Sequence, residues 1–172
     1  MKRTSRTFAV VVTAGLLLVG TAISPAVAAP KSDKGKVTTL VTYTDNRSRT
    51  QVDYDSDGSL ELGDIIDYEY SISLTPGGET IGVSYSQGDV IAYKPESGMN
   101  TRRVEIQKKL PGGDVFLIGL SVLPAGTSPQ PGWQASYAII GGTGKYEGAR
   151  GSDTYTLLPD GRTFESVMRL LK

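Results

Sequence analysis

Apolar and polar residues alternate along most of the chain after residue 36. The clearest run covers residues 66–74, where Ile66, Tyr68, Tyr70, Ile72 and Leu74 occupy every second position and polar residues fill the positions between them. A period of two is typical of a strand with one buried face, and no window of this chain sustains the period near 3.6 that a core helix needs. The pattern therefore predicts an all-β domain.

Turn sequences separate the predicted strands. Thr75-Pro76-Gly77-Gly78, Pro111-Gly112-Gly113 and Pro159-Asp160-Gly161 each place a proline before residues that tolerate a left-handed backbone. Eight or nine short strands in one domain predict a closed barrel or a sandwich, and the pattern alone does not decide between them. Besides residues 66–74, the predicted strands cover residues 37–45, 80–87, 90–94, 101–110, 114–123, 134–140, 151–158 and 162–171.

The first 28 residues have the order of a secretory signal peptide. Lys2, Arg3 and Arg6 precede an uncharged run over residues 8–19, and the segment ends in Ala26-Val27-Ala28. Thr13 and Gly15 interrupt the run, and Gly20, Thr21, Ser24 and Pro25 follow it, so the segment lacks the roughly 20 predominantly apolar residues of a membrane anchor. The sequence predicts a secreted, extracellular protein with a cleaved signal peptide (1–28), no membrane association after cleavage, a mobile polar tail (29–36) and one domain (37–172).

Composition excludes several kinds of chemistry. The 172 residues contain no His and no Cys, which removes histidine-based triads, zinc sites built from imidazole and thiolate, and disulfides. The 18 basic residues balance the 18 acidic ones. Cleavage of the signal peptide would remove three basic residues and no acidic one, so the mature chain would be mildly acidic. No nucleic-acid partner is expected, because such a partner normally needs a strongly basic face.

A glycine-rich segment follows the strand predicted at 134–140. Residues 141–151 read Gly-Gly-Thr-Gly-Lys-Tyr-Glu-Gly-Ala-Arg-Gly, which lacks the spacing of a P-loop and predicts a tight connection to the next strand. This segment resembles the Gly-Gly-Thr/Ser-Gly-x-Phe/Tyr-x-Gly-Ala-x-Gly turn of the allene oxide cyclase and dirigent protein superfamily. A second stretch of the chain, upstream of this segment, also resembles the family. It consists of Leu62-Gly63-Asp64, the strand that follows, the turn at Gly77-Gly78 and Ile81-Gly82.

The resemblance covers nearly all of residues 37–171 and implies a fold and an activity. The family's fold is an eight-stranded antiparallel β-barrel of calycin type. Its members enclose reactive small molecules, either to cyclise an unsaturated fatty-acid epoxide or to orient phenoxy radicals made by a separate oxidase. The implied partner is a small hydrophobic or phenolic ligand, and the implied catalysis needs no cofactor. The sequence leaves the oligomeric state open, with a homo-oligomer as one alternative.

The residues of the plant cyclase site do not carry over. In the resemblance, a pocket Asn corresponds to Tyr70, a Cys to about Gly88, and a Glu and an Asn to Tyr43 and Asp45. The same parity would turn six side chains inward, and the alternative is that the tyrosines fill the barrel while Asp45 lies at a wet rim. The candidate catalytic residues are Asp45, as an acid or base, and Tyr70, and the candidate ligand-binding residues are Tyr43, Tyr68, Ser84 and Ser86.

An acidic loop between the first two predicted strands is close to a twelve-residue calcium loop. Carboxylates occupy positions 1, 3, 5, 9 and 12 counted from Asp53, with Gly58 at position 6 for the sharp turn. Position 12 is Asp rather than the usual Glu, and the alternative is an exposed acidic hairpin loop. The candidate ligands of a structural Ca²⁺ are Asp53, Asp55, Asp57, Ser59, Glu61 and Asp64.

Two functions remain open from the sequence. The first is a secreted ligand-binding barrel that acts as a cofactor-free isomerase (an intramolecular cyclase) or as a stereo-directing partner of an oxidase. The second is a non-catalytic extracellular barrel with a structural or interaction role, stabilised by calcium. An open, wet cavity lined by Asp45 and the tyrosines would favour the first function, and a barrel filled by side chains such as Tyr68 and Tyr70 would favour the second.

Overall fold

The computed structural model describes residues 36–53, 55–56, 60–94, 96–124 and 129–171. The predicted signal peptide and all but the last residue of the predicted tail lie outside these residues. Eight strands and one short 3₁₀ helix make up the described chain. They are β1 (Val37–Val52), β2 (Ile65–Ser73), β3 (Gly82–Lys94), β4 (Met99–Leu110), β5 (Gly113–Pro124), β6 (Gln134–Gly142), η1 (Gly144–Tyr146), β7 (Arg150–Leu157) and β8 (Thr163–Leu171).

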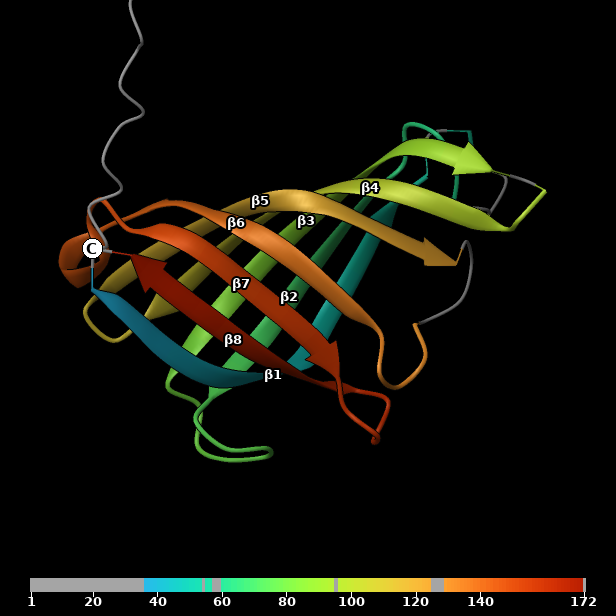
Figure 1. The fold of residues 1–172 in the computed structure, drawn as a ribbon. Coiled ribbons are helices and arrows are strands. Elements are labelled where there is room, and N and C mark those ends of the chain that lie inside the picture. Colours follow the sequence, from blue (N-terminus) through green and yellow to red (C-terminus); the bar gives the residue numbers. More distant parts are fainter. Residues whose placement is uncertain (1–35, 54, 57–59, 95, 125–128, 172) are drawn as a thin grey trace, which may run out of the picture. The chain divides into compact units, whose positions relative to one another are not determined.

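The strands form one closed antiparallel barrel in chain order (Figure 1). Each strand pairs with its neighbours along the chain, and β1 pairs with β8 from Val37↔Leu171 to Asp45↔Thr163 to close the sheet. The prediction of an eight-stranded antiparallel barrel is therefore confirmed, and the sandwich is excluded because a sandwich has no such closing pair.

Two strands differ from the predicted ones. β1 continues beyond Asp45 to Val52 and contains a bulge between Asn46 and Ser48, so its side-chain parity reverses partway along. The two runs predicted at 80–87 and 90–94 are one strand, β3. Gly88 reads as a break in the sequence, but it remains in the strand and pairs with Ile66 and Val104.

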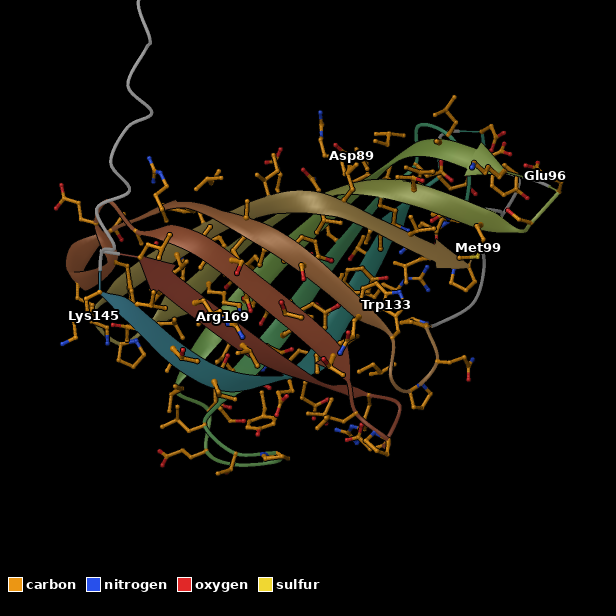
Figure 2. All side chains as sticks on the ribbon, in the orientation of Figure 1. Asp89, Glu96, Met99, Trp133, Lys145 and Arg169 are labelled. Atoms are coloured by element: carbon orange, nitrogen blue, oxygen red, sulfur yellow. The ribbon has the colours of Figure 1, made fainter. Side chains whose placement is uncertain are left out.

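One end of the barrel is packed solid. The connections β2–β3, β4–β5 and β6–β7 lie at this end, on the side where Figure 2 shows Lys145. The glycine-rich segment makes the β6–β7 connection: Gly144, Gly148 and Gly151 have positive φ, and Tyr146 and Ala149 are buried. These two residues pack with Ile72, Leu110, Val115, Met168 and Leu170, and each large apolar side chain buried here contributes about 1.5–3 kcal/mol.

The opposite end carries the other four hairpin connections and is built differently. Met99 and Trp133 lie there (Figure 2). β5 continues to Pro124, but its pairing with β6 covers only Val115–Ile118, so the two strands separate toward this end. The indole Nε1 of Trp133 donates a hydrogen bond to the Val122 carbonyl (3.3 Å) across the space between the strands. We call this end, with the β1–β2, β3–β4, β5–β6 and β7–β8 connections, the mouth.

Among the residues that the structure describes, no helix is long and apolar enough to cross a membrane.

Candidate functional site

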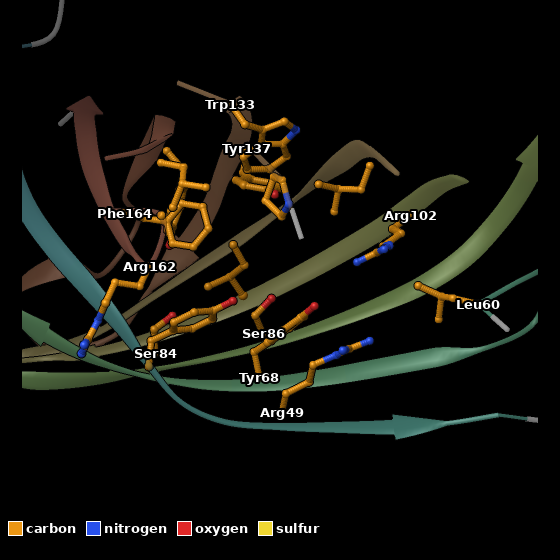
Figure 3. Close-up of a pocket in the computed structure, with 17 residues that line it drawn as sticks. Arg49, Leu60, Tyr68, Ser84, Ser86, Arg102, Trp133, Tyr137, Arg162 and Phe164 are labelled. Carbon is orange, nitrogen blue, oxygen red and sulfur yellow. The ribbon is translucent and has the colours of Figure 1, made fainter. Parts of the chain in front are cut away.

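A cavity of about 310 Å³ occupies the half of the barrel toward the mouth. Ligand pockets usually range from 300 to 1,000 Å³ and are mostly apolar with a few polar groups, and this cavity fits that description. Every strand contributes to its wall or rim (Figure 3). The lining residues on which the chemistry depends are six aromatic residues (Tyr68, Tyr70, Trp133, Tyr137, Tyr155 and Phe164), three arginines (Arg49, Arg102 and Arg162) and two serines (Ser84 and Ser86).

The aromatic rings pack against each other around the cavity. Tyr68 and Tyr70 stack with ring centroids 5.6 Å apart, since they are two residues apart on the inner face of β2. Phe164 on β8 contacts Tyr70, Trp133 and Tyr155 edge to face at 6.2–6.4 Å. Such pairs contribute about 0.5–1.5 kcal/mol each beyond the area they bury. The mutual contacts hold the rings in place, so they form a preorganised wall for a flat or unsaturated ligand.

Burial keeps the phenols of this wall protonated. Desolvation raises the pKa of Tyr70 and of Tyr155 far above the usual value, and it raises the pKa of Tyr137 to about 12. The buried Tyr155 hydroxyl makes no hydrogen bond of good geometry with the described residues, although Ser84 is near it. At neutral pH these hydroxyls are neutral donors, so they can donate a hydrogen bond to a ligand oxygen but do not act as bases.

The three arginines of the cavity differ in their partners. Arg162 at the rim is ion-paired with Asp45 (Nη2 to Oδ2, 2.5 Å), and this pair raises the pKa of Arg162. Arg102 is 6% exposed, and its Nε donates to the Asn100 side-chain oxygen (2.9 Å). Arg49 is exposed and donates to the Gln51 side chain (3.0 Å). Within the described chain, neither Arg49 nor Arg102 has a carboxylate within 4 Å.

A buried polar cluster lies next to the aromatic wall, toward the solid end. Lys108 Nζ donates to Asp153 Oδ2 (2.7 Å) and to Ser166 Oγ (2.5 Å), and Ser166 Oγ donates to Asp153 Oδ1 (2.8 Å). The Lys108 ammonium also lies 4.6 Å from the centroid of the Tyr155 ring. All three polar side chains are fully buried, and desolvation lowers the pKa of Lys108 against the opposing effect of Asp153. The cluster makes a polar layer between the cavity and the solid end.

The structure brings four of the predicted site residues together and separates two. Tyr68, Tyr70, Ser84 and Ser86 line the cavity, on neighbouring strands β2 and β3. The expectation that Tyr43 and Asp45 face inward is wrong. The buried residues of this part of β1 are Thr42 and Thr44, so Tyr43 and Asp45 have the outward parity. The Tyr43 hydroxyl donates to Glu165 (3.2 Å) on the outer surface, and this bond raises its pKa.

Several cavity residues were not identified from the sequence. Arg102 occupies the same face of β4 as Val104, Ile106 and Leu110, so the alternation of that run indicates that it points inward. Tyr155 and Phe164 are likewise on the inner faces of their strands. Arg49 could not be placed this way, because it faces inward only through the bulge in β1, which pairs it with Tyr68.

The predicted calcium loop is only partly described. Asp57 and Ser59 lie outside the described residues. Asp53 accepts a hydrogen bond from the Ser56 amide (2.7 Å), and the buried Asp64 accepts one from the Glu61 amide (2.9 Å). The residues that are described contain no cluster of three or more acidic side chains able to hold a metal. Calcium binding stays a prediction.

The barrel and its cavity define a class of protein: closed eight-stranded β-barrels with an internal pocket of ligand size. No protein-family model and no curated protein matches the sequence. Several solved structures do share the fold. One is a pyocyanin demethylase, at 21% identity and a TM-score of 0.62, over 77% of this chain and 99% of that one.

Two further solved structures share the fold with comparable TM-scores. A nonspecific heme-binding cyclase that catalyses a [4 + 2] cycloaddition in neoabyssomicin biosynthesis is 17% identical, with a TM-score of 0.62, over 82% of this chain and 69% of that one. The pterocarpan synthase dirigent protein is 16% identical, with a TM-score of 0.58, over 90% and 98% of the two chains. The fold implied by the resemblance to dirigent and cyclase barrels is thus confirmed.

Proposed function

We propose that this protein is a secreted ligand-binding barrel that encloses a small aromatic or unsaturated molecule and fixes its conformation. The observation that carries the proposal is the aromatic cavity of about 310 Å³ with its few polar groups. The presence of a cyclase and a dirigent protein among its structural neighbours supports the same conclusion. The chain would act as an intramolecular cyclase or as the stereo-directing partner of an oxidase.

The residues present would direct a reaction mainly by enclosure. The rigid rings of Tyr70, Tyr155 and Phe164 restrict the conformations of a bound chain, which lowers the entropic cost of bringing two of its atoms together. The protonated phenols donate hydrogen bonds to a carbonyl or phenolic oxygen of the ligand. Asp45, proposed from the sequence as the acid or base, does not line the cavity, so its role is limited to positioning Arg162.

Trp133 provides the test of ligand binding, because it is the single tryptophan of the chain and lines the cavity. Unsaturated fatty acids, phenols and hemin would be screened by the change in Trp133 fluorescence and by thermal shift. At a ligand concentration of 100 times Kd, binding adds about 2.7 kcal/mol and raises Tm on the order of 5–10 °C. Hemin is included because one neighbour binds haem, although this chain lacks His and Cys as iron ligands.

A matched pair of variants locates the binding. Ser86→Phe places a ring inside the cavity, whereas Gln87→Phe places the same ring on the outer surface one residue later. We expect the ligand response to disappear in the first variant and to persist in the second. Equal responses in both variants, or no response in the wild type, would contradict the proposal. The secreted state is tested by N-terminal sequencing of the exported protein, which should begin at Ala29.

A second candidate function is supported by the outer surface. Leu120 and Val122 are 57% and 52% exposed and lie two residues apart on the outer face of β5, and apolar groups exposed together often mark an interface. The candidate is a non-catalytic barrel that associates with a second copy of itself. Sedimentation of the wild type against Leu120→Asp tests it: a dimer that the variant converts to a monomer is expected, and a monomeric wild type would contradict it.

A further inference from the structure

The charges around the cavity are unbalanced. The 17 described residues that line it include Arg49, Arg102 and Arg162 but no carboxylate. Arg162 is neutralised by Asp45, which lies outside the cavity. Among the described residues, Arg49 and Arg102 therefore present two guanidinium charges to the cavity without an anion.

The guanidinium of Arg102 is buried without an ion pair to any described residue, so the free energy of its desolvation is not offset by a carboxylate. Its hydrogen-bonding partners among the described residues are neutral: Nε donates to the Asn100 side-chain oxygen (2.9 Å), and the Tyr68 hydroxyl also interacts with the guanidinium. Asn100 in turn donates to the Leu60 carbonyl (3.4 Å). The Nη groups stay available as donors. Desolvation lowers the pKa of Arg102, Tyr68 partly offsets the effect, and the charge of Arg49 adds to it. A buried cation is normally paired, and no described residue supplies the anion, which points to an external one.

The local structure holds Arg102 in this position. Gly88 on β3 has no side chain beneath it, and a Cβ at that position would lie 3.7 Å from Arg102 Cδ. The aliphatic part of Arg102 therefore lies over the backbone of β3 while its guanidinium is fixed by Asn100. A Cβ at Gly88 would make an ordinary van der Waals contact with this side chain.

Arg49 reaches the same region from the other side. The bulge in β1 places it opposite Tyr68 on the inner face. Figure 3 shows Arg49 and Arg102 on the wall that also carries Tyr68 and Ser86, with both guanidinium groups directed into the cavity. Arg49 is close enough to Arg102 to lower its pKa by repulsion, and an anion between the two would remove that repulsion.

We infer that Arg49 and Arg102 form an anion site, and that the ligand of this barrel is a small aromatic or unsaturated carboxylic acid. The carboxylate presents two oxygens to the guanidinium donors, and the apolar part extends toward Tyr70, Tyr155 and Phe164. The inference rests on the proposed function, and it adds the charge and the orientation of the ligand.

The test compares two probes of the same shape. 2-Naphthoate carries a carboxylate and 2-naphthamide is its neutral counterpart, and their dissociation constants would be measured by calorimetry. We expect wild type to bind 2-naphthoate at least tenfold more tightly, which is the usual size of a charge-assisted hydrogen bond. Added NaCl should weaken the binding of 2-naphthoate and leave that of 2-naphthamide unchanged.

Three variants separate the site from general charge and from folding. Arg102→Gln should lose most of the preference for 2-naphthoate while binding 2-naphthamide within threefold of wild type. Arg49→Gln, at an exposed position where folding is less affected, should lose part of it. Arg103→Gln removes the same charge one residue later, from an outward side chain paired with Asp89, and should behave as wild type.

The outcomes distinguish the two levels of the proposal. If wild type binds both probes equally, or if Arg102→Gln and Arg49→Gln both keep the full preference, the anion site is overturned and the ligand-binding barrel stands. An equal loss of preference in Arg103→Gln would also overturn the site, because it would make the effect one of net charge. If neither probe binds, both the site and the proposed function are overturned.

Discussion

Replacing Lys108 by Met tests whether the buried polar layer acts as one unit. Met has nearly the length of Lys but no charge, so the change removes the bonds to Asp153 and Ser166 while filling the same space. Asp153, fully buried, would keep only the hydrogen bond from Ser166. Breaking a buried pair from one side costs about 3–5 kcal/mol, since the remaining charge is left in a medium that solvates it poorly.

A comparison of the single and double variants measures the free energy of interaction between Lys108 and Asp153. Asp153→Leu alone leaves Lys108 buried without its carboxylate, and we expect a similar loss of about 3–5 kcal/mol. Replacing both residues removes both charges, so the loss should be smaller than the sum of the single losses by at least about 2 kcal/mol. Lys109→Met is the control, because that side chain is exposed and should change stability by less than about 0.5 kcal/mol.

Urea unfolding followed by Trp133 fluorescence measures these differences. An unchanged slope with denaturant would show that the variants unfold from the same compact state. Losses that add without interaction, or a loss below about 1 kcal/mol for Lys108→Met, would refute the view that the layer is a coupled and desolvated network.

Three further predictions concern other parts of the barrel. Tyr155→Phe should leave stability at pH 7 within about 1 kcal/mol of wild type or raise it, because the buried hydroxyl lacks a good hydrogen bond. Burial raises the pKa of Tyr155 in the folded state, so above pH 10 only the unfolded phenol ionises. The free energy of unfolding of wild type should therefore fall by about 1.4 kcal/mol per pH unit through this group, and parallel pH profiles of wild type and Tyr155→Phe would contradict this. Gly151→Ala should destabilise the barrel far more than Gly161→Ala. A Cβ at Gly151 would lie 1.9 Å from the Arg169 carbonyl oxygen, whereas a Cβ at Gly161 would meet nothing within 4 Å, and similar urea midpoints of the two variants would contradict the prediction. Millimolar Ca²⁺ should raise Tm, and Asp55→Ala with Asp57→Ala should abolish the rise; an unchanged Tm in wild type would rule out the calcium loop.

Much of the barrel could be predicted from residue patterns, because each strand has one buried face. The sequence pattern correctly locates β2 and the glycine-rich connection to β7, although the predicted strand runs one residue too far, to the exposed Leu74. The cavity was harder to predict. Its wall includes Arg49, which turns inward only because a single extra residue near Arg47 reverses the parity along β1. Tyr43 and Asp45 lie before this bulge, and their inward assignment came from the family resemblance alone.

Lys108 shows a second reason for the incomplete prediction of the site. It occupies an inward position in a strand that otherwise alternates regularly, and a charged residue there has a partner only through strands distant in sequence. Asp153 and Ser166 come from β7 and β8, and nothing in the local sequence of β4 indicates them. Pairs between residues this distant in sequence can be identified only when the order and register of the strands in the closed barrel are known.

The separation of the barrel into a solid half and a hollow half has a consequence for how such proteins diversify. Residues that hold the fold together, such as Tyr146 and Met168, lie in one half, and residues that would select a ligand, such as Arg49 and Trp133, lie in the other. The two sets meet at Ile106, Tyr137 and Tyr155, which belong to the core and also line the cavity, whereas substitutions at the rim, such as at Arg49 and Trp133, leave the main core untouched. A lineage of such barrels can exchange one ligand for another through a few changes at the mouth, with little risk of losing the folded state on the way.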